Sequence, residues 1–225
     1  MKKKAVVLLS GGLDSSTALY WAKAKGYHCE GLSIFYGQRH ARELLSAQAL
    51  AKKAKVKIHQ IKLDLPWLKI SSLNDRTKKL PNLPLTQIGR GEIPSTYVPG
   101  RNTVFLSLAL SLADATQAQA IVIGANALDY SGYPDCRPNY LNAFERMANL
   151  GTKNGSMGRP IKILSPLLHL DKEQIVRLAF KLKVPLELTW SCYAGEKNPC
   201  GKCDSCKLRA KGFLLAKASD PALKI

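Results

Sequence analysis

The sequence is short of acidic residues and of long apolar runs, and it has no internal repeat and no low-complexity segment. Its longest apolar stretch, TVFLSLALSLADA at 103–115, carries polar residues and falls short of the ~18 consecutive apolar residues of a membrane-spanning helix. The apolar run AVVLL after the initial lysines leads directly into a glycine turn. This run is too short for the apolar core of a signal peptide. We therefore expect a cytoplasmic protein with no membrane contact.

The shortage of acidic residues leaves the chain strongly basic. It has 16 Asp and Glu against 34 Lys and Arg, a formal net charge of +18. Such a charge favours polyanionic partners, for example tRNA, nucleotides or pyrophosphate. The lysines are dispersed rather than clustered, so a generally basic set of solvated side chains explains the charge equally well. The 225 residues suit one domain, or one domain with a small appendage.

Strand-length apolar runs alternate with helical patterns over the first two thirds of the chain. Strands are expected at 6–10, 28–36, 56–63, 120–125 and 161–168, with helices at 14–25, 40–54 and 101–116. A further helix starts after Asp171, with Gln174 three residues on, and continues to Pro185; a last helix covers 204–217. This alternation predicts an α/β fold, a Rossmann-like doubly wound parallel sheet that binds ligands beyond the carboxyl ends of its strands. Residues 64–100 are too long for a simple connection and form either a lid or an ordered wrap.

The first strand ends in the loop SGGLDSS at 10–16, immediately before a helix. Backbone N–H groups and the helix dipole favour an anion at such a point. No lysine follows the glycines, so the loop is not a Walker A loop. Asp14 would repel phosphate, so it is expected to hold Mg²⁺ or to cap the helix. By spacing alone, an ordinary capped strand–turn–helix remains an alternative.

This loop resembles the pyrophosphate-binding loop (PP-loop) of the ATP pyrophosphatases, which include GMP synthetase, asparagine synthetase, NAD synthetase and tRNA-thiolating enzymes. The resemblance implies an adenine nucleotide alpha hydrolase-like fold. It also implies a reaction in which a substrate oxygen attacks the α-phosphorus of ATP and pyrophosphate leaves. A γ-phosphate lysine is not needed for that chemistry. The resemblance assigns ATP binding to Ser10, Gly11, Gly12, Leu13, Asp14, Ser15 and Ser16.

Further stretches resemble one group within that superfamily, the 7-cyano-7-deazaguanine synthases of queuosine biosynthesis. They are FYGQRH (35–40), YVPGRN (97–102), GANALDYSGYPDCRP (124–138), and TWSCY (189–193) with PCGKCDSC (199–206). The resemblance implies an ATP- and Mg²⁺-dependent carbon–nitrogen ligase. It would convert 7-carboxy-7-deazaguanine and ammonia to the nitrile through an adenylated acid and an adenylated amide. The alternatives are a tRNA-thiolating enzyme of the same superfamily and a non-catalytic, zinc-stabilised nucleic-acid-binding protein.

The resembling stretches place polar side chains in loops at the expected ligand edge. Asp14 and Arg101 are the expected catalytic residues, although Arg101 stands where it can either meet phosphate or cap a helix. The Gly and Pro of 124–138 favour a shaped pocket over a helix face. A carboxylate there suits the N–H edge of a guanine-like base, and an arginine suits a carboxylate; a polar surface loop is the alternative. The expected substrate-binding residues are Gln38, His40, Asp129, Asp135 and Arg137.

Four of the six cysteines form the pattern C-x7-C-x2-C-x2-C: Cys192, Cys200, Cys203 and Cys206. Four thiolates can hold one tetrahedral Zn²⁺ in a closed structural site, and spacing alone leaves an iron–sulfur cluster open. The family resemblance favours zinc. Cys29 is expected in the core, and Cys136 in the pocket loop has no catalytic role. We expect an ATP-binding domain at 1–185, a zinc-binding subdomain with a closing helix at 186–225, and small-molecule partners rather than nucleic acid. A homodimer is compatible with the sequence.

Overall fold

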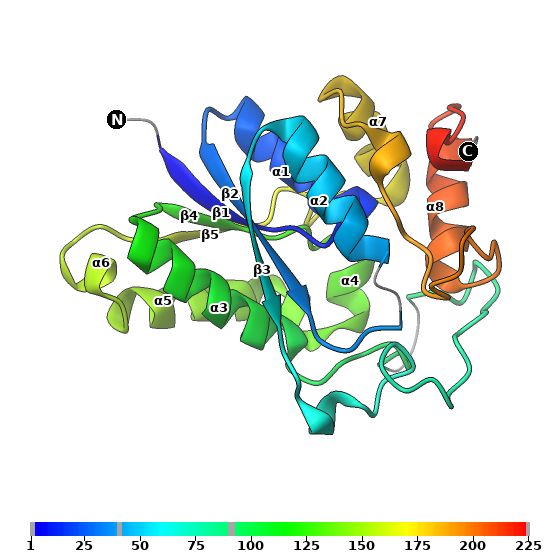
Figure 1. Ribbon diagram of the computed structural model, residues 1–225, viewed down its shortest axis with the longest axis horizontal. Helices are drawn as coiled ribbons and strands as arrows, with labels where there is room; N and C mark the ends of the chain where they lie inside the picture. The colour runs from blue at the N-terminus through cyan, green and yellow to red at the C-terminus, as the bar shows by residue number, and fades with distance from the viewer. Residues whose placement is uncertain (1–2, 40–41, 90–92, 224–225) are drawn as a thin grey trace.

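The computed structural model describes residues 3–39, 42–89 and 93–223. Within them, one sheet runs in the order β3-β2-β1-β4-β5, and every neighbouring pair of strands is parallel (Figure 1). This confirms the predicted doubly wound sheet, because the strand order reverses direction between β1 and β4. The strands are β1 Lys4–Leu8, β2 His28–Phe35, β3 Lys57–Lys62, β4 Ala120–Val122 and β5 Lys162–Leu164.

Helices cover both faces of the sheet. Helices α1, α2 and α7 lie on one face, and α3 and α5 on the other, while α8 lies at the end of the molecule near the carboxyl terminus (Figure 1). The helices are α1 Leu13–Ala24, α2 Arg42–Ala54, α3 Arg101–Thr116, α4 Ala127–Gly132, α5 Pro138–Leu150, α6 Lys153–Ser156, α7 Lys172–Lys181 and α8 Asp204–Leu215.

Strand β1 is buried on both sides, which explains its continuous apolar run. Val7 and Leu9 pack with α1, α2 and α7, whereas Val6 and Leu8 pack with α3 and α5. Successive side chains of a strand point to opposite faces, so a strand between two helical layers needs apolar residues at every position. The central strand therefore carries its terminal loop, residues 10–16, on a rigid support.

The chain between β4 and β5 contains helices that the sequence analysis did not predict. Helix α4 corrects the expectation of a loop without a helix face at 124–138, since the Asn126 side chain accepts hydrogen bonds from the N–H groups of Leu128 and Asp129.

Helix α7, which follows β5, begins with the predicted capping box of Asp171 and Gln174. It ends at Lys181 rather than at Pro185, because Lys183 has a left-handed φ of 56°.

The described part of residues 64–100, namely 64–89 and 93–100, forms an ordered wrap. Leu68, Leu73 and Val98 make a small buried cluster of their own. The N–H of Leu83 donates to Asp204 Oδ1 at 2.9 Å, which ties the wrap to the first turn of α8. The described part of residues 64–100 therefore packs against the carboxyl-terminal segment.

The carboxyl-terminal residues share a core with the sheet. Leu186 and Phe213 belong to the same buried cluster as the side chains of α1 and α7. The domain boundary at residue 185 stays a prediction. No helix within the described ranges has both the length and the apolar character needed to cross a membrane.

Candidate active site

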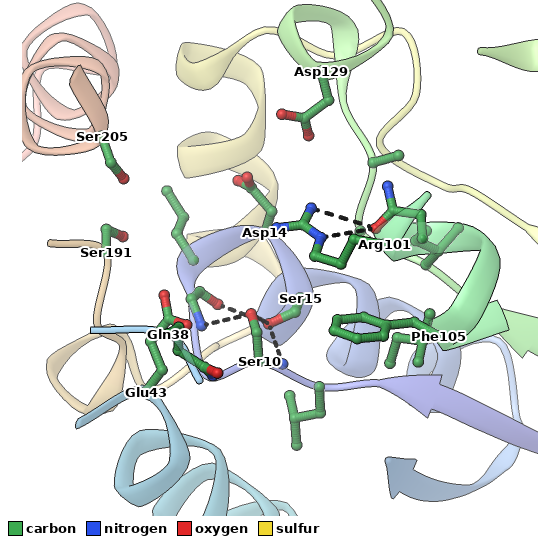
Figure 2. Close-up of a pocket in the computed structure, with 18 of the residues that line it drawn as sticks. Ser10, Asp14, Ser15, Gln38, Glu43, Arg101, Phe105, Asp129, Ser191 and Ser205 are labelled. Carbon is green, nitrogen blue, oxygen red and sulfur yellow. Dashed lines mark hydrogen bonds between the residues drawn. The ribbon is translucent and has the colours of Figure 1, made fainter. Parts of the chain in front are cut away.

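A cavity of about 280 Å³ opens where the loops after β1 and β4 diverge (Figure 2). This is the topological switch point of the sheet, the usual ligand-binding position in such folds. Its wall includes eight of the residues singled out from the sequence: Ser10, Gly12, Leu13, Asp14, Ser15, Gln38, Arg101 and Asp129. The fold therefore brings the loop at 10–16 together with residues from the stretches 35–40, 97–102, 124–138 and 189–193.

The loop at residues 10–16 requires glycine at position 11. Gly11 has a φ of 90°, and a Cβ there would lie 2.4 Å from the carbonyl oxygen of Glu43. Gly124, after β4, is equally constrained, because its Cβ would lie 2.9 Å from the N–H nitrogen of Ser15. These close approaches place α2 and the end of β4 directly against the loop.

The serines of the loop fall into two groups. Ser10 and Ser15 face the cavity and share a hydrogen bond between their hydroxyls at 3.0 Å. Ser16 is fully buried and its hydroxyl donates to the Gly12 carbonyl at 2.6 Å. The hydroxyls of Ser10 and Ser15 are therefore available to bind an anion, whereas the Ser16 hydroxyl stabilises the loop through its hydrogen bond to Gly12.

Asp14 meets a lysine that the sequence analysis missed. Lys172 Nζ, at the start of α7, lies 2.5 Å from Asp14 Oδ2, and the Asn126 side-chain amide donates to the same oxygen at 3.0 Å. Burial disfavours the charge of Lys172, but Asp14 and Asp129 outweigh this effect and raise its pKa. Asp14 Oδ1 is buried and has no hydrogen-bond partner among the described residues. A lysine thus lies against the loop, contributed by a helix 158 residues later in the chain.

Asp129 lies in the first turn of α4 and faces the same cavity (Figure 2). Its Oδ2 accepts hydrogen bonds from the Asn126 backbone at 3.2 Å and side chain at 2.7 Å. Burial raises the pKa of the Asp129 carboxyl to about 6, while Lys172 opposes that rise and Asp14 adds to it. Asp129 is therefore a cavity carboxylate with a raised pKa, held in place by Asn126.

Arg101 is the first residue of α3 and lies across the cavity from Ser191 and Ser205 (Figure 2). Its guanidinium contacts Asn102 Oδ1 at 3.4 Å and the Tyr36 hydroxyl at 3.5 Å. Within the described ranges, no carboxylate oxygen lies within 4.0 Å of it. Since an arginine stays protonated, the cavity contains a positive charge available to an anionic ligand.

Three tyrosines give the cavity neutral, flat walls. Burial raises the pKa of Tyr36 and of Tyr193, and it raises that of Tyr133 to about 12. The Tyr133 hydroxyl shares a hydrogen bond with Thr96 at 2.7 Å. All three line the cavity as uncharged aromatic side chains at neutral pH.

The other predicted substrate-binding residues have different positions. Gln38 lines the cavity and its Oε1 accepts from the Tyr36 N–H at 2.8 Å. Asp135 is buried behind the cavity, where its Oδ2 accepts from the Asn102 N–H at 2.9 Å and caps α3. Arg137 is exposed and outside the cavity lining. His40 lies outside the described residues.

The two isolated cysteines are packing residues. Cys29 is buried in the core, as predicted. Cys136 lines the cavity and accepts a hydrogen bond from the Asn102 side chain at 3.0 Å. Burial raises the pKa of the Cys136 thiol, and Asp129 adds to the rise. A protonated, buried thiol is a poor nucleophile.

Cys192, Cys200, Cys203 and Cys206 meet in one cluster. Their sulfur atoms all lie within 4.8 Å of one another, and all four thiols are free of disulfides. Backbone N–H groups of Ala194 and Cys200 point at Cys192 Sγ, at 3.4 and 3.3 Å. A tetrahedral thiolate site with metal–sulfur distances of ~2.3 Å requires such a cluster. The four cysteines therefore have the arrangement expected of a structural metal site.

Comparison with known proteins determines the family. The family described as Queuosine biosynthesis protein QueC matches residues 4–217. The chain belongs to the QueC family. It is 52% identical to the 7-cyano-7-deazaguanine synthase of Nostoc punctiforme over 219 residues, 97% of this chain and 98% of that protein. It is 54% identical to the 7-cyano-7-deazaguanine synthase of Prochlorococcus marinus strain MIT 9215 over 212 residues, 94% of this chain and 93% of that protein.

A solved structure supports the fold of this QueC-family enzyme. NMN synthetase from Francisella tularensis superposes with a TM-score of 0.51 at 18% identity, covering 99% of this chain and 81% of that chain. Identity at this level shows a shared fold alone. The QueC-family chain is thus an enzyme of queuosine biosynthesis on an adenine nucleotide hydrolase-like α/β fold.

Proposed function

We propose that this enzyme converts 7-carboxy-7-deazaguanine and ammonia to 7-cyano-7-deazaguanine, consuming ATP in two adenylation steps. One observation carries the proposal: the PP-loop, the Asp14–Lys172 pair and Arg101, which has no carboxylate partner among the described residues, face a single cavity. Anion-binding groups for a nucleotide and a cation for an acidic substrate are thereby adjacent. A carboxylate cannot react with ammonia directly because its oxygen is a poor leaving group, so the acid must first be activated.

In the first half-reaction, a carboxylate oxygen of the substrate attacks the α-phosphorus of ATP and pyrophosphate leaves. The hydroxyls of Ser10 and Ser15 and the N–H of Gly12 would bind the departing pyrophosphate. Lys172 stands beside the loop and would stabilise charge at phosphorus. Arg101 would orient the acid before attack, and the reacting atoms would gain from that fixed geometry.

Ammonia then attacks the acyl carbon, AMP leaves, and the amide forms. In the second half-reaction the amide oxygen attacks a second ATP, and loss of AMP and two protons leaves the nitrile. Asp129, whose pKa is about 6, is the cavity carboxylate suited to accept a proton at neutral pH. The neutral tyrosines Tyr36, Tyr133 and Tyr193 would enclose the flat deazaguanine ring.

The described residues fit the two metal ions expected of such an enzyme. Asp14 Oδ1 is a buried carboxylate oxygen without a hydrogen-bond partner among the described residues, and it would hold the Mg²⁺ that accompanies ATP. That ion would neutralise charge on the phosphates. The four cysteines would hold Zn²⁺, since a closed set of four thiolates suits this ion and offers no open position for catalysis. Reduced, free thiols accord with a cytoplasmic enzyme.

A tRNA-thiolating activity receives no support from the cavity. Thiolation through a protein persulfide needs a reactive cysteine near the nucleotide. The cysteine that lines the cavity in the described ranges, Cys136, is buried and has a raised pKa. The remaining candidates belong to the four-cysteine cluster or to the core.

The test is an incubation of the enzyme with 7-carboxy-7-deazaguanine, ATP, Mg²⁺ and ammonia, followed by mass spectrometry and nucleotide analysis. The proposal expects the amide and then the nitrile, with two AMP formed for each nitrile. Asp14→Ala should abolish turnover while metal content and fold are retained. Formation of ADP and phosphate, or no ATP-dependent loss of the acid, would rule out the adenylation scheme.

A further inference from the structure

The peptide bond between Gly11 and Gly12 is held from outside the ATP loop. The backbone N–H of Trp190 donates to the Gly11 carbonyl oxygen at 2.9 Å. In a trans peptide, the C=O and the following N–H point in opposite directions. The N–H of Gly12 is therefore directed away from Trp190 and toward the Ser10 hydroxyl, at 3.4 Å, on the cavity wall.

This orientation matters for anion binding because the opposite one is sterically accessible. Glycines on both sides of a peptide bond allow it to rotate without a side-chain clash. In the observed orientation the Gly12 N–H can donate to a phosphate oxygen. In the reverse orientation the Gly11 carbonyl oxygen would face the phosphate and repel it. Two consecutive glycines thus need an external contact that selects one orientation.

Trp190 itself is anchored next to the metal site. Its indole Nε1–H donates to the carbonyl oxygen of Cys192 at 3.0 Å, and its ring is almost completely buried under the guanidinium of Arg42, 4.5 Å from the ring centre. Cys192 is the first of the four cysteine ligands. The metal site and the Gly11 carbonyl are therefore linked through three consecutive residues, 190–192.

The other anchor of this segment is Arg209, on α8. Its guanidinium binds Asp220 in a bidentate manner, at 2.6 and 2.9 Å, and both side chains are buried. Nη1 of Arg209 also donates to the hydroxyls of Thr189 at 2.8 Å and Ser191 at 3.2 Å. The residues on both sides of Trp190 are thus held by one buried cation.

We propose that residues 189–192 form a clamp that locks the Gly11–Gly12 peptide in its anion-binding orientation, with Arg209 as the positioning residue and the four-cysteine metal site as the second anchor. This inference rests on the proposed binding of ATP by the loop. Its consequence is that the metal site, although closed, controls nucleotide affinity. Loss of either anchor weakens ATP binding and leaves the deazaguanine pocket around Arg101 intact.

The main test compares Arg209→Lys with Lys211→Ala, a matched variant of an exposed residue on the same helix. A lysine keeps the charge beside Asp220 but cannot also reach both hydroxyls. Affinity for α,β-methylene-ATP, which cannot be cleaved at the reacting bond, is measured by calorimetry on metal-loaded protein. Loss of about one backbone hydrogen bond predicts about tenfold weaker binding for Arg209→Lys. Metal content and the KM for the acid should stay at wild-type values, as should all properties of Lys211→Ala.

A second measurement distinguishes local loosening of residues 189–192 from a loss of stability of the whole protein. Hydrogen-exchange mass spectrometry of the peptide that contains Trp190 should show faster amide exchange in Arg209→Lys and in metal-free wild type. Equal nucleotide affinity in Arg209→Lys and wild type overturns the inference, as does weakened affinity with unchanged exchange at Trp190. If chelation unfolds the wild type, Arg209→Lys decides the question alone. A metal-loaded wild type that binds no nucleotide would instead refute the proposed function of the loop.

Discussion

The ion pair between Lys172 and Asp14 offers a quantitative test of the site. The two charged atoms lie 2.5 Å apart, and the side chains are 17% and 23% exposed. Exposed pairs contribute about 0–1 kcal/mol, whereas removing one partner of a buried pair costs about 3–5 kcal/mol. The intermediate burial of this pair places the expected destabilisation of Lys172→Met at about 2 kcal/mol. For a chain of this length, that corresponds to a fall in Tm of roughly 4–8 °C.

Urea denaturation and activity measurements on three variants check this reasoning. Lys172→Met should be destabilised and inactive, because Asp14 is left as an unpaired carboxylate and phosphorus loses a cation. The double variant Lys172→Met with Asp14→Asn should recover most of the stability and none of the activity. Lys181→Met, exposed on the same helix, should stay within about 0.5 kcal/mol of wild type. A double variant no more stable than Lys172→Met would refute the assignment of the cost to an unpaired charge.

Two further variants test Asp129 and Gly11. Burial raises the pKa of Asp129 to about 6, so the folded state binds this proton more tightly than the unfolded state and the ionised carboxylate costs stability above pH 6. Asp129→Asn should thus be more stable than wild type by about 2 kcal/mol at pH 8, and the difference should shrink as the pH falls from 6 to 4; a pH-independent difference in unfolding free energy would contradict this. Gly11→Ala should lower both Tm and ATP affinity, because its Cβ would meet the Glu43 carbonyl at 2.4 Å. Gly26→Ala, with a φ of 83° and no atom within 4 Å of the added Cβ, is the matched control and should lose only the ~1 kcal/mol of backbone strain, seen by thermal melting.

The sequence predicted secondary structure correctly where short stretches of residues determine it. The apolar run AVVLL, the glycine turn and the following helical pattern predicted β1, the turn at 10–12 and α1, because burial on both faces and a close backbone approach leave a direct trace in residue type. The capping box of Asp171 and Gln174 was found for the same reason. Helix α4 was missed because Gly and Pro in 124–138 indicated a loop, whereas the Asn126 cap and the packing around it allow a short helix.

Side-chain roles were less predictable, because they depend on which helices pack together. Asp135 has the residue type of a base-binding carboxylate, yet its Oδ2 accepts from the Asn102 N–H and caps α3. Arg137 lies in the most family-specific stretch but is exposed. For Gln38, Asp129 and Arg101, a role at the substrate stays a prediction supported by their place on the cavity wall.

The sequence by itself determined the parallel α/β sheet, the glycine turn after its first strand and the cluster of four cysteines, since hydrophobic periodicity, glycine placement and cysteine spacing act over short stretches of chain. Only the tertiary structure decided that Lys172 pairs with Asp14 of the loop and that the Trp190 N–H donates to the Gly11 carbonyl. Both contacts join residues more than 150 positions apart. Such pairs are created when α7 and the carboxyl-terminal segment pack against α1 and its loop, and no local pattern encodes that docking.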